Sequence, residues 1–328
     1  MKSRIHLVAL AAACALVAFH AGTALAQADA YPARAVRLIV PFPAGGGNDN
    51  VARPIAVKVA EYVGQPVVID NKPGAGTMIG AEAAARSAPD GYTLFLASVG
   101  SHGVNPNLYK KVPYDPVKDF DPISLLATAS NLMVTRKDAP WKTVNDFVAA
   151  ARAAPGKYTY ASPGIGTPAH LAAEMFKAQT GIDILHVPYK GGANYLPDVV
   201  TGRVDIVFDS TTSSIPFMKS GQLVGVAISR EARLLEFPDV PTFAEAGYPQ
   251  FQSGTWYGVL APAGTPRAAI EKLNRAFQRA VQEPEIASRL RGLGADPVGN
   301  SPQAFAAFIR AELAKYAKVI RDNNITAE

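Results

Sequence analysis

Short apolar segments alternate with longer amphipathic segments along most of the chain. The apolar segments have the length and the β-branched or aromatic content of buried strands. We predict strands over residues 36–41, 66–70, 92–97, 125–134, 158–161, 184–187, 205–208, 223–228 and 256–261. The amphipathic segments predict helices over residues 78–87, 144–153, 169–179, 267–281 and 301–323. This alternation indicates an α/β fold with mostly parallel sheets flanked by helices.

The chain is long enough for two domains, yet no low-complexity linker separates them. Its 328 residues, 48% of them hydrophobic, can bury a large core. Two lobes without a linker require the chain to cross the waist more than once, and we place these crossings near residues 127–131 and 250–255. We therefore predict a first lobe of residues 27–127 plus 252–328 and a second lobe of residues 128–251.

The first residues have the pattern of a cleaved signal peptide. Lys2 and Arg4 precede the apolar run 5–19, and the small residues Ala24-Leu25-Ala26 follow it. We predict a signal peptide over residues 1–26 and export to the periplasm. The apolar run is shorter than a membrane-spanning helix, and no later stretch is long enough to be one.

The single cysteine, Cys14, lies inside this leader, so the mature chain has no thiol for disulfides, catalysis or metal binding. A lipid-anchored cysteine is the alternative, but residues 11–13 lack the large aliphatic residue usual before such a site. Removing Lys2 and Arg4 with the leader leaves 30 basic against 27 acidic residues. The sequence has no run of basic residues typical of a nucleic-acid-binding surface, so we expect no nucleic-acid partner.

Loops that follow strands and open helices are the places to search for a ligand site, because the crevice of a parallel sheet lies beyond the carboxyl ends of its strands. The first such loop, residues 41–50, contains Gly45, Gly46 and Gly47, which allow a ligand to approach the backbone closely. The helix that begins just after it adds a positive dipole end suited to an anion. Asp49 can cap this helix or contact a ligand. A dinucleotide site is disfavoured, because Asn50 stands where that motif needs its third glycine.

Three further loops offer hydroxyl, imidazole or carboxylate groups. Residues 98–106 contain two serines and His102, which can contact a ligand or satisfy the loop backbone. Residues 162–170 read as a helix start with Thr167 as cap and Pro168 in the first turn, facing the first loop across a cleft. Asp209 in residues 209–212 can hold an ammonium group, hold a water or cap the next segment.

Two other segments are more ambiguous. The glycines of residues 71–77 are interpreted as packing residues that let a helix approach the sheet. Trp256 and Tyr257 can form an aromatic wall or belong to the core. His170 is expected to serve as a structural hydrogen-bonding residue more readily than as a ligand contact.

Catalytic and metal-binding signals are weak in the mature chain. Ser162 is not in a G-x-S-x-G turn. His102, His170 and His186 form no His-x-x-x-His pair, so we expect neither a metal site nor a cofactor.

Several separated motifs together resemble the receptors of tripartite tricarboxylate transporters, also called Bug proteins. They are Tyr31-Pro32 with residues 36–41, the Pro-Phe-x-Ala-Gly-Gly-x-x-Asp-x-x-Ala-Arg run ending at Arg53, Asn71-Lys72-Pro73-Gly74-Ala75-Gly76, residues 88–94, His186-Val187-Pro188-Tyr189-Lys190-Gly191 and Trp256-Tyr257-Gly258. The resemblance covers essentially the whole mature chain. The chain departs from the family pattern in two places: at Thr77, where many relatives have glycine, and at residues 101–104.

The resemblance implies a two-lobed periplasmic binding protein of the Venus-flytrap type, which is not an enzyme. It implies a solute that is a small carboxylate, such as a dicarboxylate or an aromatic carboxylate, and partners that are the membrane permease subunits. We expect a monomer. The predicted ligand-binding residues are Phe42, Ala44, Gly45, Gly46, Gly47, Asp49, Ser98, Ser101, His102, Ser162, Gly164, Thr167, His170, Asp209 and Ser210. The alternatives are a secreted hydrolase and a ligand receptor for a sensor kinase.

Overall fold

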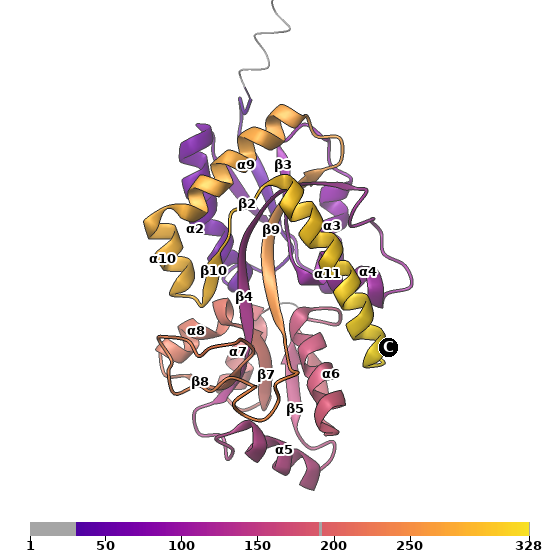
Figure 1. The fold of residues 1–328 in the computed structure, drawn as a ribbon, viewed down its shortest axis with the longest axis vertical. Helices are drawn as coiled ribbons and strands as arrows, with labels where there is room; N and C mark the ends of the chain where they lie inside the picture. Colours follow the sequence, from indigo (N-terminus) through magenta and orange to yellow (C-terminus); the bar gives the residue numbers. More distant parts are fainter. Residues whose placement is uncertain (1–30, 190–191, 328) are drawn as a thin grey trace, which may run out of the picture.

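The strands form one continuous ten-stranded sheet that runs through both halves of the molecule. The computed structural model describes residues 31–189 and 192–327, and of residues 192 and 193 only the backbone. The strand order is β2-β1-β3-β9-β4-β7-β5-β6, with β8 and β10 also paired to β4. Figure 1 shows the result as two lobes, one above the other, with helices on the outside.

Lobe 1 is built on three parallel strands: β1 (Val36–Val40), β2 (Val67–Asn71) and β3 (Thr93–Ala97). Its helices and short turns are α2 (Gly47–Val63), η2 (Ala75–Thr77), α3 (Met78–Ala85), η3 (Gly100–Val104), α4 (Asn105–Leu108), α9 (Arg267–Gln282), α10 (Pro284–Arg291) and α11 (Pro302–Asp322). The turn η3 is π-helical. The short strand β10 (Ala295–Pro297) completes the lobe.

Lobe 2 repeats this plan with the parallel strands β5 (Thr159–Ser162), β6 (Leu185–Pro188) and β7 (Ile206–Ser210). The strand β8 (Leu223–Ile228) and the helices α5 (Val144–Ala153), α6 (Pro168–Thr180), α7 (Gly192–Val200) and α8 (Thr211–Lys219) surround them. Nearby residues determine where two of these helices begin. Thr143 and Asp146 form a capping box before α5, and the Ser210 side chain caps α8.

Two long antiparallel strands connect the lobes, and Figure 1 shows them side by side. They are β4 (Phe120–Arg136) and β9 (Gly254–Pro262). Along β4 the partner changes: residues up to Ser130 pair with β9, and residues from Asn131 pair with β7. Side chains alternate along a strand, so neighbouring residues at this change of partner point to opposite faces of the sheet.

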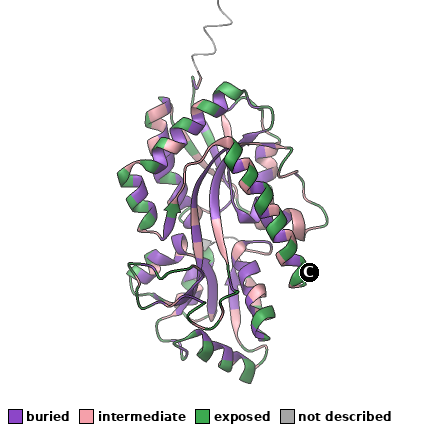
Figure 2. Cartoon of the chain, in the orientation of Figure 1, coloured by how far each residue is buried: buried purple, intermediate pink, exposed green. Residues whose placement is uncertain are grey.

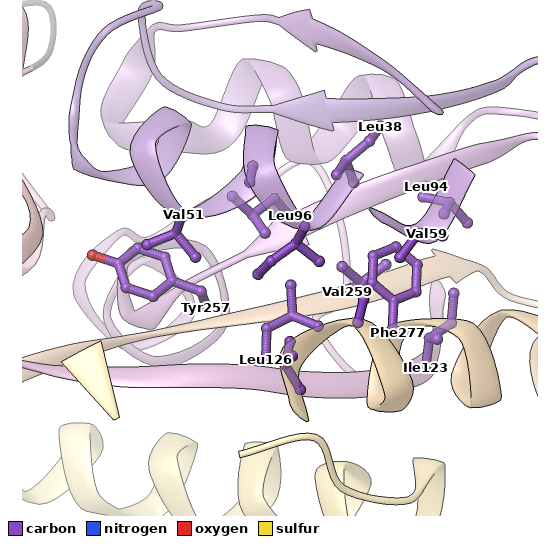
Figure 3. Close-up of a cluster of buried hydrophobic side chains, with 14 of the residues drawn as sticks. Leu38, Val51, Val59, Leu94, Leu96, Ile123, Leu126, Tyr257, Val259 and Phe277 are labelled. Atoms are coloured by element: carbon purple, nitrogen blue, oxygen red, sulfur yellow. The ribbon is translucent and has the colours of Figure 1, made fainter. Parts of the chain in front are cut away.

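Four hydrophobic clusters form the cores. The largest joins β1, β3, β4 and β9 to α2 and α9, and Figure 3 shows its aliphatic side chains around Leu96 and Phe277. Tyr257 belongs to this cluster, but its hydroxyl oxygen points away from the other labelled side chains. Figure 2 shows the strands buried and the outer faces of the helices exposed. The cores therefore hold the sheet in place, and the loops at the strand ends remain available for a ligand site.

The predicted α/β fold is confirmed, and each predicted strand and helix has a counterpart in the structure. The strand β4 extends further at both ends than predicted, and the helices α7, α8 and α10 were not predicted. The lobe boundaries at residues 127/128 and 251/252 remain a prediction. The predicted signal peptide, residues 1–26, lies outside the described residues. None of the helices in the described ranges combines the length and apolarity needed to cross a membrane.

Candidate functional site

Three helices from the two lobes begin around one small cavity of about 50 Å³. They are α2 of lobe 1 and α6 and α8 of lobe 2. We call this space the helix-end cavity. Its lobe 1 and crossing-strand residues are Phe42, Gly46, Gly47, Asn48, Asn131, Thr255 and Tyr257. Its lobe 2 residues are Pro163, Pro168, Ala169, Tyr195, Asp209, Ser210 and Ser213.

The helix starts supply hydrogen-bond donors to this cavity. The first helical bond of α2 runs from the Asn50 amide to the Gly46 carbonyl, so the amides of Gly47 and Asn48 have no partner within the helix. The Leu171 amide likewise bonds to Thr167, which leaves the Ala169 amide at the start of α6. Each helix start also carries a partial positive charge of about half a unit. Together they form a site for an anion.

One side chain at this cavity still lacks a partner. The Asn48 side-chain oxygen is buried and has no hydrogen-bond partner among the residues that the structure describes. Because side-chain amide oxygen and nitrogen are assigned from the hydrogen-bond network, this group can offer either a donor or an acceptor. It is therefore suited to a polar group of a ligand.

Asp209 forms the base of the cavity at the end of β7. Its carboxylate accepts hydrogen bonds from the Tyr195 hydroxyl at 2.6 Å, the Ser214 hydroxyl at 2.7 Å and the Ser210 amide at 2.8 Å. Burial raises the pKa of Asp209 to about 6, although these hydrogen bonds act in the opposite direction. A carboxyl group with this pKa changes its charge close to neutral pH.

Hydrogen bonds across the cavity connect the two lobes. The Tyr257 hydroxyl lies 2.6 Å from the Thr212 hydroxyl and 3.0 Å from the Ser210 hydroxyl. The Asn50 side chain donates to the Thr212 carbonyl at 3.1 Å. A Cβ placed on Gly47 would lie 2.4 Å from the Thr212 hydroxyl oxygen, so only glycine fits between the lobes at this point. The structure is thus a closed form.

A second, larger cavity of about 250 Å³ adjoins the first and shares Phe42 and Pro163 with it. We call it the proline-walled chamber. Its other lobe 1 residues are Pro41, Pro43, Pro73, Gly74, Ala75, Gly76, Thr77 and Tyr109, and its other lobe 2 residues are Gly164, Ile165, Thr167, Pro188 and Tyr189. The Tyr109 hydroxyl donates to the Ile165 carbonyl at 3.2 Å and links the lobes here as well.

The chamber wall contains an unusual backbone turn. Gly74, Ala75, Gly76 and Thr77 all have positive φ, and the φ of the β-branched Thr77 is +89°. A β-branched residue in this region is rare and strained, and such strain concentrates at ligand clamps. The segment that the sequence suggested as packing residues therefore forms a wall of the chamber.

The structure brings seven of the predicted ligand-binding residues to these two cavities. Phe42, Gly46, Gly47, Asp209 and Ser210 line the helix-end cavity. Gly164 and Thr167 line the proline-walled chamber.

The remaining lobe 1 loop residues lie beside the cavities. Ala44 and Gly45 are exposed. The Asp49 carboxylate accepts from the Gly45 amide at 3.0 Å and from Arg53 at 2.6 Å. Burial would raise the pKa of Asp49, but the hydrogen bonds from Arg53, Gly45 and Asn71 outweigh it and lower the pKa. Asp49 thus braces the loop and neutralises Arg53.

Ser98, Ser101 and His102 lie inside lobe 1, outside the linings of both cavities. The His102 ring packs among Phe95, Tyr114 and Phe120, and its Nδ1 lies 2.9 Å from the Ser101 hydroxyl oxygen. Burial lowers the pKa of His102 to about 3, so it stays neutral. Their predicted ligand contacts remain predictions.

Ser162 and His170 lie behind the start of α6 and not in the cavity linings. The Ser162 hydroxyl is 2.7 Å from His186 Nε2 and also bonds to the backbone of Gly164. The rings of His170 and His186 are 4.7 Å apart. Burial lowers the pKa of His186 to about 4. Ser162 has no exposed surface, so Ser162 and His186 are better placed to hold the loop in position than to attack a substrate.

The sequence analysis missed the tyrosines of both cavities, of which Tyr257 alone was considered as a possible wall. Tyr109 and Tyr195 lie at or in helices, and Tyr189 lies in the His186–Gly191 motif, which was used only for the family resemblance. Asn131 lies inside the strand β4 and not in a loop after a strand. It reaches the cavity only because β4 crosses between the lobes at this point. Within the described ranges, no group of His, Cys, Asp or Glu side chains could hold a metal ion.

Comparison with known proteins identifies the family. The family model described as "Tripartite tricarboxylate transporter family receptor" matches residues 51–325. The chain belongs to this receptor family. Among its relatives, protein BugT of Bordetella pertussis (strain Tohama I) is 37% identical to this receptor over 297 residues, which cover 90% of this chain and 91% of BugT.

Solved structures of related receptors have the same fold. A structure described as a periplasmic transporter has a TM-score of 0.89 at 41% identity, covering 91% of this chain and 100% of that one. Rpa4515 of R. palustris, solved with adipate, has a TM-score of 0.87 at 36% identity, covering 90% and 99%. MatC of Rhodopseudomonas palustris, solved with bound malate, has a TM-score of 0.85 at 34% identity, covering 88% and 100%. The receptor thus has the two-lobed periplasmic binding protein fold expected from its motifs.

Proposed function

We propose that this receptor captures a small organic carboxylate between its lobes in the periplasm and delivers it to a tripartite tricarboxylate-type membrane transporter. One observation carries the proposal: the starts of α2, α6 and α8, contributed by both lobes, surround the same cavity. An anion placed there receives donors from both lobes at once. Binding of the anion would then stabilise the closed form.

The binding energy can come from uncharged groups. Arg53 is already paired with Asp49, and the cavity lining contains no Lys or Arg among the described residues. Hydrogen bonds to a charged group contribute about 1.5–3 kcal/mol each. About four such bonds, less the cost of closure, support micromolar binding, near −8 kcal/mol. The size of the cavity, about 50 Å³, fits a single carboxylate group.

The related structures support a carboxylate as the solute. Adipate and malate, bound by Rpa4515 and MatC, are both carboxylates. The fold and the helix-end cavity provide the same kind of chemistry in this receptor. Uptake and signalling through a sensor kinase would use the same closed form, and the family assignment favours uptake.

The first experiment tests closure around an anion. Isothermal titration of the purified mature receptor with a panel of mono- and dicarboxylates identifies binding, and the Gly47→Ala variant is titrated with the same ligands. A Cβ on Gly47 would lie within 2.6 Å of the hydroxyl oxygens of Thr212 and Ser213, so the variant should not close and should lose most of its affinity. Unchanged affinity in Gly47→Ala would reject this cavity as the site.

Gly292→Ala is the matched control. A Cβ there meets only the Ser288 and Arg289 carbonyl oxygens, at 3.4 and 3.6 Å, and the Lys219 amine at 3.9 Å, so it should leave affinity unchanged. The hydrolase alternative is tested with the same protein, because a receptor returns its ligand unchanged whereas an enzyme converts candidate esters. Uptake of labelled ligand into vesicles that contain the membrane subunits, with and without the receptor, tests delivery.

A further inference from the structure

The proline-walled chamber differs chemically from the helix-end cavity. Five of its lining residues are prolines: Pro41, Pro43, Pro73, Pro163 and Pro188. Proline has no backbone N–H, so these residues present only hydrocarbon and carbonyl groups. A second carboxylate of a ligand would need donors that this part of the wall cannot supply.

The hydroxyl groups of the chamber are already engaged in the protein. Tyr109 donates to the Ile165 carbonyl, Thr167 donates to the Gly164 carbonyl at 2.6 Å, and Tyr189 donates to the Asp198 carboxylate at 2.6 Å. The Thr77 hydroxyl accepts from Asn105. A ligand that took a donor from Tyr109, Thr167 or Tyr189 would have to break one of these bonds.

The described lining of the chamber is uncharged: none of its residues is Lys, Arg, His, Asp or Glu. Two described cations directly adjoin lining residues in the chain. Lys72 is 3.6 Å from the Asp70 carboxylate, and Lys110 is exposed. An anion in the chamber would therefore have no charged partner in its described lining.

The chamber is large enough for a ring or a short alkyl chain. Its volume is about 250 Å³, and a dry apolar cavity of about 150 Å³ is known to accept benzene. Because Phe42 and Pro163 belong to both linings, a ligand whose carboxylate lies at the helix starts can extend past these two residues into the chamber.

We infer that the solute is a monocarboxylate whose far end is an uncharged, apolar group held in the proline-walled chamber. This inference rests on the proposed function, because it assumes that one carboxylate occupies the helix-end cavity. It separates this receptor from its relatives Rpa4515 and MatC, which were solved with the dicarboxylates adipate and malate.

The test compares ligands that differ only at the far end. Hexanoate and adipate have six carbons each, and only adipate carries a second carboxylate. Phenylacetate tests whether the chamber accepts a ring. Isothermal titration of the mature receptor should show hexanoate binding at least about tenfold more tightly than adipate, because the second charge of adipate would be desolvated without a partner. Phenylacetate should bind within about tenfold of hexanoate, because burial of apolar area is not directional.

A positive charge introduced at the chamber should weaken this preference. Ala75 lines the chamber, is exposed, and already holds a Cβ at a φ of 46°, so Ala75→Lys adds a cation without further backbone strain. The ratio of adipate to hexanoate affinity should rise at least about fivefold. Leu235→Lys, at a side chain that is 96% exposed and outside both linings, is the control and should leave the ratio unchanged.

Each outcome separates the inference from the proposed function. If adipate binds as tightly as hexanoate or more tightly, the inference is wrong and the carboxylate receptor stands. An unchanged ratio in Ala75→Lys also overturns the placement of the far end in the chamber. If no mono- or dicarboxylate binds, the proposed function itself is wrong.

Discussion

The helix-end cavity and the proline-walled chamber lie side by side between the same two lobes, yet they offer a ligand different chemistry. The cavity of about 50 Å³ is surrounded by three helix starts and by Asp209, Ser210 and Tyr257. The chamber of about 250 Å³ is lined by prolines, glycines and tyrosines, with no charged residue in its described lining. One space is suited to a charge and the other to hydrocarbon.

This difference shows how a receptor can keep one part of its recognition while changing another. Anion binding at the cavity depends on backbone amides, which every residue except proline supplies. Selection at the chamber would depend on short loops such as residues 73–77, which lie outside the starts of α2, α6 and α8. Under the proposed function, relatives that bind other solutes would therefore share the fold and the helix-end cavity.

A negative charge placed at the helix-end cavity should have the largest effect. Asn48→Asp should weaken every carboxylate about 100-fold, since two like charges about 5 Å apart repel by roughly 3 kcal/mol at an effective dielectric constant of about 20. Asp in the first turn of α2 should not lower the melting temperature, because it complements the helix dipole. Titration and thermal unfolding measure both effects.

The control for Asn48→Asp puts the same charge in the chamber wall. Ala75→Asp should reduce the affinity for hexanoate no more than about fivefold, because the charge lies away from the bound carboxylate and near solvent. Equal losses in the two variants would contradict the division of the site into a charged and an apolar part.

Removal of the Tyr257 hydroxyl should have the next largest effect. Tyr257→Phe loses the hydrogen bonds to Ser210 and Thr212 that join the lobes, and we expect about tenfold weaker binding, since each such bond contributes about 1 kcal/mol. Tyr248→Phe, which loses a bond to Asn145 within lobe 2, is the matched control. Wild-type affinity in Tyr257→Phe would mean that these bonds do not stabilise the closed form.

The pH dependence of binding should report on Asp209. Its pKa of about 6 lies above the usual value, and a bound anion would raise the pKa further, so binding should take up protons. Between pH 7.5 and 5.5, affinity for a carboxylate should increase about fivefold as Asp209 is neutralised. Titration in buffers with different ionisation enthalpies measures the proton uptake.

Asp209→Asn tests the origin of this pH dependence. The variant should bind with nearly constant affinity over the same pH range, because the amide does not titrate. A wild-type pH profile in Asp209→Asn would assign the dependence to another group.

The smallest expected effect lies at the chamber. Tyr109→Phe loses the single hydrogen bond to the Ile165 carbonyl, and we expect about threefold weaker binding of hexanoate and adipate alike. Tyr31→Phe is the control, because its hydroxyl bonds to the Gly91 carbonyl within lobe 1 and outside both linings. A change in the ratio of the two ligands in Tyr109→Phe would show that this hydroxyl contacts the far end of the ligand directly.

Much of the fold was predictable because the local signals agree with it. The strand and helix patterns, the Thr143 capping box and the Ser301-Pro302 start of α11 are all consequences of nearby residues. The extension of β4 and its antiparallel pairing with β9 were not predictable, because pairing joins segments more than a hundred residues apart. A short strand such as β10 has too few residues for any periodic signal.

The candidate site was predictable in part for the same reason. Gly46, Gly47 and Ser210 stand at helix starts, which the sequence marks with glycine or a cap. Ser101 and His102 offer the right groups in a loop after a strand, but the π-helical turn η3 directs them into the aromatic core of lobe 1. Polarity alone does not say on which side of a loop a side chain lies.

The sequence by itself determined the α/β class, the family and the glycine-rich helix starts, because each is a pattern of residue types along the chain that does not depend on which segments meet in space. Only the tertiary structure decided that α2, α6 and α8 begin at one cavity, that Tyr257 connects the lobes, and that five separate prolines form one wall. The physical reason is that the site lies between lobes joined by β4 and β9, and the geometry of that junction is set by packing over the whole molecule.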